Sequence, residues 1–217
     1  MSKKNNILLL IGLFIFYIAL QYIPYGKLLL YPINLIVTFL HEFGHAFFAI
    51  ITGGGVRSIE INTDGSGLAM TSGGIQSIIL MGGYIGSALF GNILLYTSIK
   101  WSDEASKNTI YLLGGLMISS ALFLFSGIIS SFLLILIWIG IIYLAKAFAY
   151  WRAFLWFIGL ASLAYIILDF RVGPSSDLSK FSDIFLIVPQ FVWMYVWLAI
   201  VLSLVFYNLR FIFQKDT

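Results

Sequence analysis

The sequence predicts an all-α polytopic membrane protein with about seven transmembrane helices, within a range of five to seven, and a small β-hairpin at the membrane surface. Of the 217 residues, 61% are hydrophobic and only 10% are charged, whereas about 25% are charged in an average soluble domain. The mean hydropathy is +1.01. A soluble domain of this size buries only about 70% of its surface on folding, so it could not hide this much apolar area from water. We therefore expect a single integral-membrane domain over residues 1–217, solvated by the lipid bilayer.

The composition also excludes several classes of protein. The chain contains no cysteine, so thiolate metal ligands and disulfide-stapled folds are excluded. The high apolar content excludes an intrinsically disordered chain. The net charge is +3, but the basic residues occur singly along the chain. Without a basic stripe, we expect no nucleic-acid partner.

Seven apolar segments are long enough to cross a hydrocarbon core about 30 Å thick, which needs roughly 20 residues per helix. The first segment follows Lys3 and Lys4 and lacks a small-residue cleavage site, so we interpret it as a retained anchor. Thr109–Phe170 has room for three helices, with breaks at Ser126-Gly127 and Lys146–Arg152. Without the break at Ser126, the number of spans falls to six or five. The spans outside that segment are expected at Ile7–Ile23, Leu28–Ile51, Ile75–Ile99 and Pro189–Phe213.

Two polar connections lie outside these helices. In residues 52–74, the segment Val56–Ile61 alternates apolar and polar side chains, as a half-exposed strand does. A turn at Thr63-Asp64-Gly65 and a second short segment, Gly67–Ser72, complete a predicted β-hairpin. The second connection, residues 171–188, contains Gly173-Pro174-Ser175-Ser176 and is predicted to be a polar or re-entrant loop.

Both histidines of the chain lie in one short motif of the second predicted span, His41-Glu42-Phe43-Gly44-His45. Residues four apart on a helix lie one turn apart on the same face, so the two imidazoles can share one Zn²⁺. Glu42 is adjacent and can take a proton from a water that the metal activates, which is the arrangement of a zinc hydrolase. The sequence therefore predicts a zinc site with His41 and His45 as ligands and Glu42 as the catalytic base.

The membrane setting makes this short motif informative. An ionisable residue within a span costs about 2.5–3.5 kcal/mol on insertion scales. Three such residues within five positions need a compensating interaction, and a bound metal supplies one. The alternative interpretation is a polar histidine network packed between helices.

A third protein ligand must be a carboxylate, because the chain has no other histidine and no cysteine. The second and sixth predicted spans run in the same direction, so their C-terminal ends reach the same face of the membrane. His45 lies about 9 Å below that face, within reach of Asp169 at the end of the sixth span and of Asp177 in the loop after it. An ion pair with Arg171 is the alternative role for Asp169, and helix capping is the alternative for Asp177. The sequence leaves both aspartates open as the third ligand.

The third predicted span carries small residues at helical spacing. Gly82 and Gly86 are four apart, and Ser87 and Gly91 repeat the pattern, which is typical of closely packed membrane helices. A second interpretation is a smooth face along which a substrate segment approaches the metal, with Asn92 hydrogen-bonding to its backbone. Gly82, Gly86 and Asn92 are therefore candidate substrate-channel residues.

Taken in order, these motifs resemble the M50 metallopeptidases, the site-2 protease-like intramembrane enzymes, and are most similar to the M50B-like branch. The resemblance covers most of residues 33–197 and implies a zinc-dependent peptidase that cuts within or near a membrane. It carries over the ligand role to His41 and His45 and the base role to Glu42. Site-2 proteases place their third ligand in a Leu-Asp-Gly motif, whereas here Phe170 follows Leu168-Asp169. The remaining matching motifs are Thr52-Gly53-Gly54, Ile59-Glu60, Gly73-Gly74, Gly82-Gly83-Tyr84-Ile85-Gly86-Ser87, Gly91, Arg171-Val172, Ser175-Ser176-Asp177 and Lys180-Phe181.

We therefore expect an intramembrane zinc metalloprotease whose partners are the lipid bilayer and a membrane-protein substrate segment. The hairpin of residues 56–72 could present the substrate as an added strand. The alternative is a non-catalytic metal-binding membrane scaffold or assembly factor on the same fold. A zinc or proton transporter would need several intramembrane carboxylates along a path, and only Glu42 and Asp169 qualify.

Overall fold

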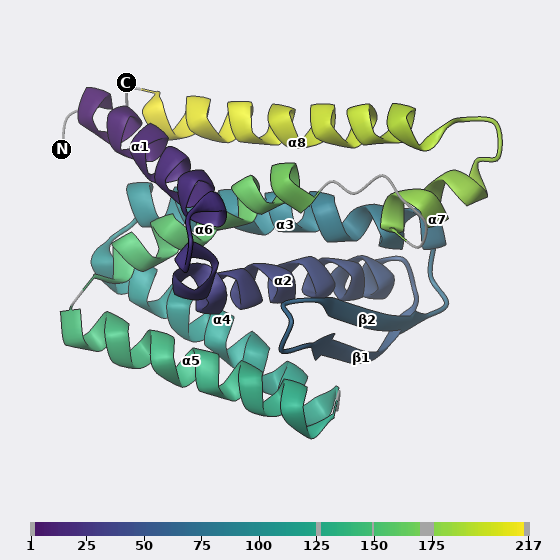
Figure 1. The fold of residues 1–217 in the computed structure, drawn as a ribbon, viewed down its shortest axis with the longest axis horizontal. Coiled ribbons are helices and arrows are strands. Elements are labelled where there is room, and N and C mark those ends of the chain that lie inside the picture. The colour runs from purple at the N-terminus through teal and green to yellow at the C-terminus, as the bar shows by residue number, and fades with distance from the viewer. Residues whose placement is uncertain (1–2, 125–126, 149, 170–175, 215–217) are drawn as a thin grey trace.

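The structure, a computed structural model, describes residues 3–124, 127–148, 150–169 and 176–214. Within these residues the chain forms eight helices and one two-stranded antiparallel sheet (Figure 1). In chain order the elements are α1 (Lys3–Tyr22), α2 (Gly26–Ile51), β1 (Gly55–Ile61), β2 (Gly67–Ser72), α3 (Gln76–Lys100), α4 (Asp103–Phe123), α5 (Ile128–Phe148), α6 (Trp151–Asp169), α7 (Asp177–Ile184) and α8 (Gln190–Phe213).

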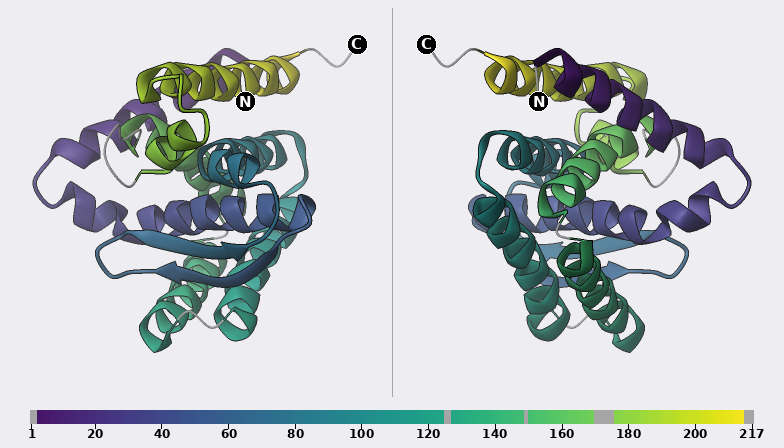
Figure 2. Two further views of the ribbon diagram at one scale, coloured as in Figure 1. Left: turned by 90° about the vertical axis from the view of Figure 1, so that its right-hand side faces the viewer. Right: turned by 90° about the vertical axis from the view of Figure 1, so that its left-hand side faces the viewer.

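Helix α3 occupies the centre of the helical bundle, where it packs against α2, α6 and α8. Helices α4 and α5 pack on each other at one edge of the molecule, and α8 lies at the opposite edge, as the end-on views of Figure 2 show. The short helix α7 contacts both α3 and α8. The histidine-bearing helix α2 is thereby enclosed between α3 on one side and the hairpin on the other.

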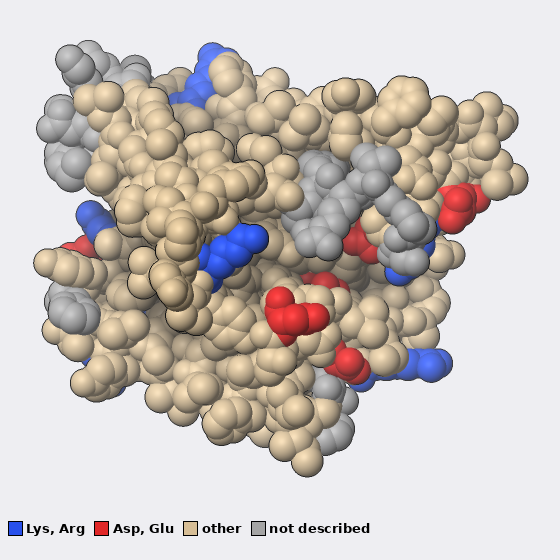
Figure 3. Space-filling model, viewed as in Figure 1, with Lys and Arg blue, Asp and Glu red and all other residues tan. Residues whose placement is uncertain are grey.

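Five helices of the described residues are long and apolar enough to cross a membrane, namely α2, α3, α5, α6 and α8. Helix α1 contains a shorter apolar run, Ile7–Tyr22, and α4 is less apolar because charged residues occupy its first turns. This number of candidate spans, five, is the lower end of the predicted range of five to seven transmembrane helices. The face drawn in Figure 3 is mostly uncharged, as expected of a surface that meets lipid. The protein is a multi-pass integral membrane protein.

The long apolar segment Thr109–Phe170, which was predicted to contain three helices, divides at the two predicted breaks. Helix α4 ends at Phe123 and α5 begins at Ile128, while α5 ends at Phe148 and α6 begins at Trp151. Ser126 itself lies outside the described residues. All seven predicted spans therefore correspond to helices.

Helices α2 and α3 approach each other through glycines. A Cβ atom built on Gly86 would lie 2.9 Å from the Cα of Gly44, and one built on Gly82 would lie 2.9 Å from the carbonyl oxygen of Gly44. A Cβ built on Gly44 would collide with the carbonyl oxygen of Gly82. Only glycine lets two helix backbones meet this closely. This contact presses α3 against the histidine motif.

The predicted hairpin is present, with Ile59 opposite Ala69 and Ile61 opposite Gly67. Ile59 and Ile61 are fully buried, because β1 packs between α2 and the α4–α5 pair. The hairpin runs back alongside α2 instead of lying flat beyond its end. The hydroxyl of Thr38 donates to the carbonyl of Gly65 at 2.9 Å, so the turn lies about 20 Å along α2 from its C-terminus.

Residues 171–188, predicted to be a polar or re-entrant loop, contain the short helix α7. Its side chains are amphipathic: Leu178 and Phe181 are buried, whereas Lys180 and Asp183 are exposed. The side chain of Ser176 caps the helix by accepting a hydrogen bond from the Ser179 N–H at 3.1 Å. Asp177 is therefore the first residue of a folded helix.

Candidate metal centre

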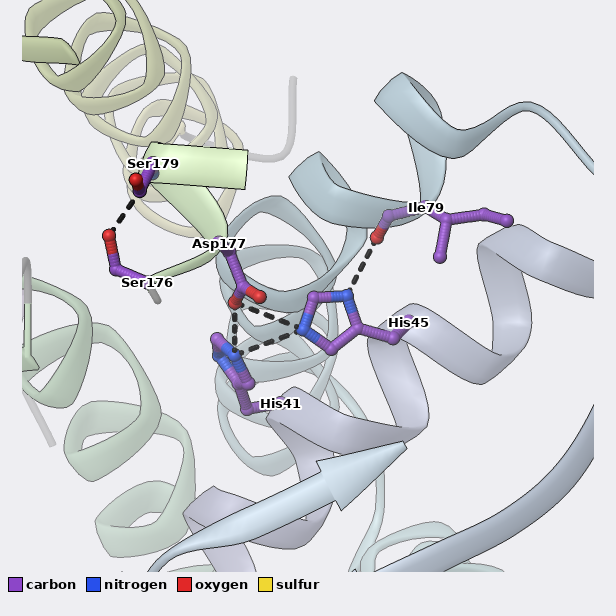
Figure 4. Close-up of polar contacts among 6 residues, drawn as sticks. All are labelled: His41, His45, Ile79, Ser176, Asp177 and Ser179. Carbon is purple, nitrogen blue, oxygen red and sulfur yellow. Dashed lines mark hydrogen bonds and ion pairs between the residues drawn. The ribbon is translucent and has the colours of Figure 1, made fainter. Parts of the chain in front are cut away.

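Three ligand atoms from α2 and α7 converge on one point (Figure 4). The Nε2 atoms of His41 and His45 are 3.2 Å apart, and each lies 3.2 Å from Oδ2 of Asp177. Among the described residues, this is the one cluster of three or more histidines, aspartates or glutamates that could hold a metal ion. The structure thus brings Asp177 to the histidines, whereas the side chain of Asp169 lies outside the described residues.

The donor set and its spacing fit zinc. Two ligands that each lie about 2.0 Å from a tetrahedral Zn²⁺ stand about 3.3 Å apart. The three sides of the His41–His45–Asp177 triangle all measure 3.2 Å. Two imidazole nitrogens and one carboxylate oxygen also match the ligand types of zinc sites that keep a fourth position open.

The two imidazoles are oriented by different contacts. Nδ1 of His45 lies 2.7 Å from the carbonyl oxygen of Ile79 on α3, so it donates a proton there and leaves the lone pair of Nε2 for a metal. His41 packs edge-on against the ring of Tyr84, with ring centroids 4.8 Å apart. Its Nδ1 atom is buried and has no hydrogen-bond partner within the described residues. Helix α3 therefore orients both rings, one by a hydrogen bond and one by packing.

Asp177 is held in place by the aromatic packing of α7. Phe181, one turn further along the helix, packs against Trp193 and Trp197 of α8 with ring centroids 4.9 and 5.0 Å apart. Trp197 in turn contacts Tyr84, at 5.8 Å. These aromatic contacts place the Asp177 carboxylate with Oδ2 at 3.2 Å from Nε2 of each histidine. A carboxylate oxygen in that position is a ligand type that zinc accepts beside two imidazole nitrogens.

Glu42 lies beside this cluster, at the wall of a large cavity. The cavity has a volume of about 1270 Å³ and is lined by both histidines, Asp177, Glu42 and residues 67–71 of strand β2. The backbone N–H of Ala69 in β2 hydrogen-bonds to the Glu42 carboxylate. A Cβ built on Gly67 would lie 2.6 Å from Oε1 of Glu42. The absence of a side chain at Gly67 therefore gives the carboxylate its room.

The sequence matches the family described as Peptidase M50B-like over residues 7–208, which is most of the chain. The chain belongs to the M50B-like peptidase family. The predicted resemblance to M50 peptidases is thereby confirmed, and membership supports a protease-type function. M50 peptidases are typically zinc-dependent, in agreement with the donor set found here. Comparisons with curated proteins and with solved structures each returned no match.

In this member of the M50B-like family, the candidate channel residues of α3 are not among the residues that line the cavity. Gly82 and Gly86 face the backbone of Gly44 in α2. The Nδ2 atom of Asn92 donates to the carbonyl of Ala88 at 2.8 Å, and its Oδ1 atom accepts from Asn208 of α8 at 2.8 Å. These contacts support close helix packing and not a substrate path along α3.

Two groups of site residues were not predicted. Thr38 and Asn34 line the same cavity as His41. Asn34 precedes Thr38 by four residues, and Thr38 precedes His41 by three. This helical spacing was a signal in the sequence that could have identified them. The other group consists of backbone atoms, the carbonyl of Ile79 and the N–H of Ala69. Backbone atoms act at these points regardless of side-chain type, so the sequence carries no signal for them.

Proposed function

We propose that the protein is a zinc-dependent endopeptidase that hydrolyses peptide bonds of membrane-embedded or juxtamembrane segments. The observation that carries the proposal is the triangle of His41, His45 and Asp177 donor atoms beside the Glu42 carboxylate. The cluster lies in a cavity large enough for several residues of a peptide chain. Membership of the M50B-like family gives independent support.

In this proposal His41, His45 and Asp177 hold Zn²⁺, and Glu42 is the catalytic base. Bound zinc would supply a Lewis acid that polarises the scissile carbonyl. The Glu42 carboxylate accepts a proton from the attacking water and passes it to the leaving amine nitrogen. The hydrogen bond from the Ala69 N–H fixes the carboxylate while the missing side chain of Gly67 leaves it space.

Strand β2 is the proposed binding edge for the substrate. The sheet of the described residues has two strands, so β2 pairs with β1 on one side and lines the cavity on the other. Backbone groups along an unpaired edge bind an extended peptide as an added strand, largely independent of its side chains. A peptide bound along β2 would pass beside Glu42, because Ala69 contacts that carboxylate.

The proposal is tested with purified protein and a panel of single-span membrane substrates. We expect Glu42→Gln to keep its zinc, because Glu42 is not part of the donor triangle, and to lose roughly 10²- to 10⁴-fold in cleavage rate. His45→Ala is the matched variant that should lose both zinc and cleavage. Zinc bound by the wild type without any Glu42-dependent cleavage across the panel would overturn the proposal in favour of a non-catalytic metal-binding scaffold.

A further inference from the structure

The helix face that carries the histidines continues as a polar stripe toward the N-terminus of α2. Thr38 and Asn34 precede His41 by three and seven residues, so all three side chains lie on one face. All three line the cavity, together with Gln21 at the end of α1. Polar side chains in a membrane span are costly when they face lipid. This stripe therefore indicates that the cavity receives polar groups well beyond the metal centre.

In the side-chain amide of Asn34, the oxygen atom is hydrogen-bonded and the nitrogen atom is available to a ligand. Its Oδ1 atom accepts hydrogen bonds from the hydroxyl of Tyr17 at 2.7 Å and from Nε2 of Gln21 at 3.5 Å. Tyr17 is fully buried, so this anchor is fixed. Among the described residues, no partner is found for Nδ2 of Asn34 or for Oε1 of Gln21. A donor and an acceptor therefore stand side by side at the cavity wall.

We propose that Asn34 and Gln21 form a specificity subsite for a hydrogen-bonding substrate side chain, such as that of asparagine, glutamine, serine or threonine. The proposal rests on the endopeptidase function proposed above. A side-chain amide or hydroxyl offers both a donor and an acceptor, which complements the Nδ2 atom of Asn34 and the Oε1 atom of Gln21. The subsite thereby selects substrate spans that carry a polar residue at one defined position.

Helix geometry gives that position. Seven residues of α2 separate Asn34 from His41, which corresponds to about 10.5 Å along the helix. An extended peptide advances about 3.4 Å per residue, so about three residues separate the subsite from the cleaved bond. The hairpin runs beside this stretch of α2 toward Asn34. Its turn reaches Thr38, whose hydroxyl donates to the carbonyl of Gly65, and Gly65 and Ser66 also line the cavity.

The selectivity has a simple energetic source. A polar side chain in a membrane-spanning substrate finds few partners in lipid, and the subsite supplies two. One neutral hydrogen bond of this kind corresponds to roughly a two- to tenfold difference in kcat/KM. We expect this preference for asparagine over leucine, which has a similar size, at the matching substrate position.

The experiment moves one asparagine through five positions on each side of the cleaved bond of a single-span substrate. At each position, the cleavage rate of the substrate with asparagine is divided by the cleavage rate of the substrate with leucine at the same position. Wild type should give a maximum at about the third residue on one side. The double variant Tyr17→Phe/Asn34→Leu should give a flat profile; removing the Tyr17 hydroxyl avoids leaving an unpaired donor in the core. Each value is a ratio for one preparation, so partial misfolding cancels.

Asn208→Leu is the matched control. It removes a partly buried amide contact with Asn92, and neither residue lines the cavity, so its profile should keep the maximum. A flat profile for wild type with cleavage that still depends on Glu42 would overturn the subsite and leave the endopeptidase function standing. Absence of Glu42-dependent cleavage for every member of the series would overturn the endopeptidase function itself.

Discussion

The histidines and the aspartate of the candidate metal centre come from two helices that are built in opposite ways. Helix α2 has 26 residues and is buried along most of its second half, where it meets α3 backbone to backbone at Gly44. Helix α7 has eight residues, of which only Leu178 and Phe181 are buried. The position of the histidines is thus part of the central fold, whereas the position of Asp177 depends on a small peripheral helix.

This difference separates stability from metal binding. Substitutions at the α2–α3 contact should lower the free energy of unfolding, because the added atoms would meet backbone that cannot move aside. Substitutions in α7 should unseat one ligand and leave the bundle intact, because few contacts hold that helix. The predictions below test this separation, with the largest expected loss first and the smallest last.

The largest effect is expected for Gly44→Ala. Its Cβ would collide with the carbonyl oxygen of Gly82, so we expect a loss of about 3 kcal/mol or more in unfolding free energy. Gly140→Ala in α5 is the matched control, because nothing lies within 4 Å of its Cβ; its effect should stay within about 1 kcal/mol. Thermal unfolding of the metal-free proteins in detergent measures both. Equal stability of the two variants would contradict the close α2–α3 contact.

Asp177→Ala should come next, with its effect on zinc and not on the fold. Removing a residue that supports a ligand already costs about 10- to 100-fold in metal affinity, so losing the ligand should cost roughly 100-fold or more. Asp183→Ala, on the exposed side of the same helix, should bind zinc like wild type. Metal analysis of the purified proteins measures the difference.

The same assay discriminates between the two aspartates that the sequence left open. Asp169→Ala should retain zinc, because Asp177 completes the donor triangle with both histidines. Loss of zinc in Asp169→Ala together with full occupancy in Asp177→Ala would reverse the assignment.

These two helices also explain what the sequence could predict. The histidine pair follows from helix periodicity alone, because residues four apart share a face in any α-helix. The choice between Asp169 and Asp177 requires the path of the chain between α6 and α7, which no local pattern encodes. Helix α7 was not predicted, because eight residues are too short for a clear helical pattern. The sequence indicated only that an acid at Asp177 suits the first turn of a helix. The apolar spans, which are recognised by the length of their apolar runs, and the hairpin, whose first strand alternates apolar and polar residues, were predicted within a few residues.

Phe181→Ala should produce an intermediate effect on zinc. The ring anchors α7 to Trp193 and Trp197, so its removal should loosen Asp177 and lower zinc affinity about tenfold. Phe181→Leu should recover part of the loss because it refills most of the volume. Ile184→Ala, an exposed site on the same helix, is the control. Competition with a chelator measures the affinities, and wild-type affinity in Phe181→Ala would show that α7 does not rely on this ring.

The smallest effect is expected at the N-terminus of α7. Ser176→Ala removes the cap on the Ser179 N–H, which stabilises a helix by about 1 kcal/mol. If the whole of this energy held Asp177 in place, its loss would lower zinc affinity about fivefold. Fraying of the helix lowers the affinity only where it displaces Asp177. Fivefold is therefore the upper limit of the expected effect. Ser176→Thr keeps a capping hydroxyl and should restore the affinity.

Ser102→Ala is the matched control, because Ser102 caps α4 in the same way, accepting from the Ala105 N–H at 3.2 Å. The two substitutions remove equivalent hydrogen bonds, but only one of the caps belongs to a helix that carries a ligand. Chelator competition should therefore detect Ser176→Ala and not Ser102→Ala. Equal affinities for these two variants would mean that α7 is held against the histidines by its aromatic contacts alone, and that its own helical stability does not contribute to metal binding.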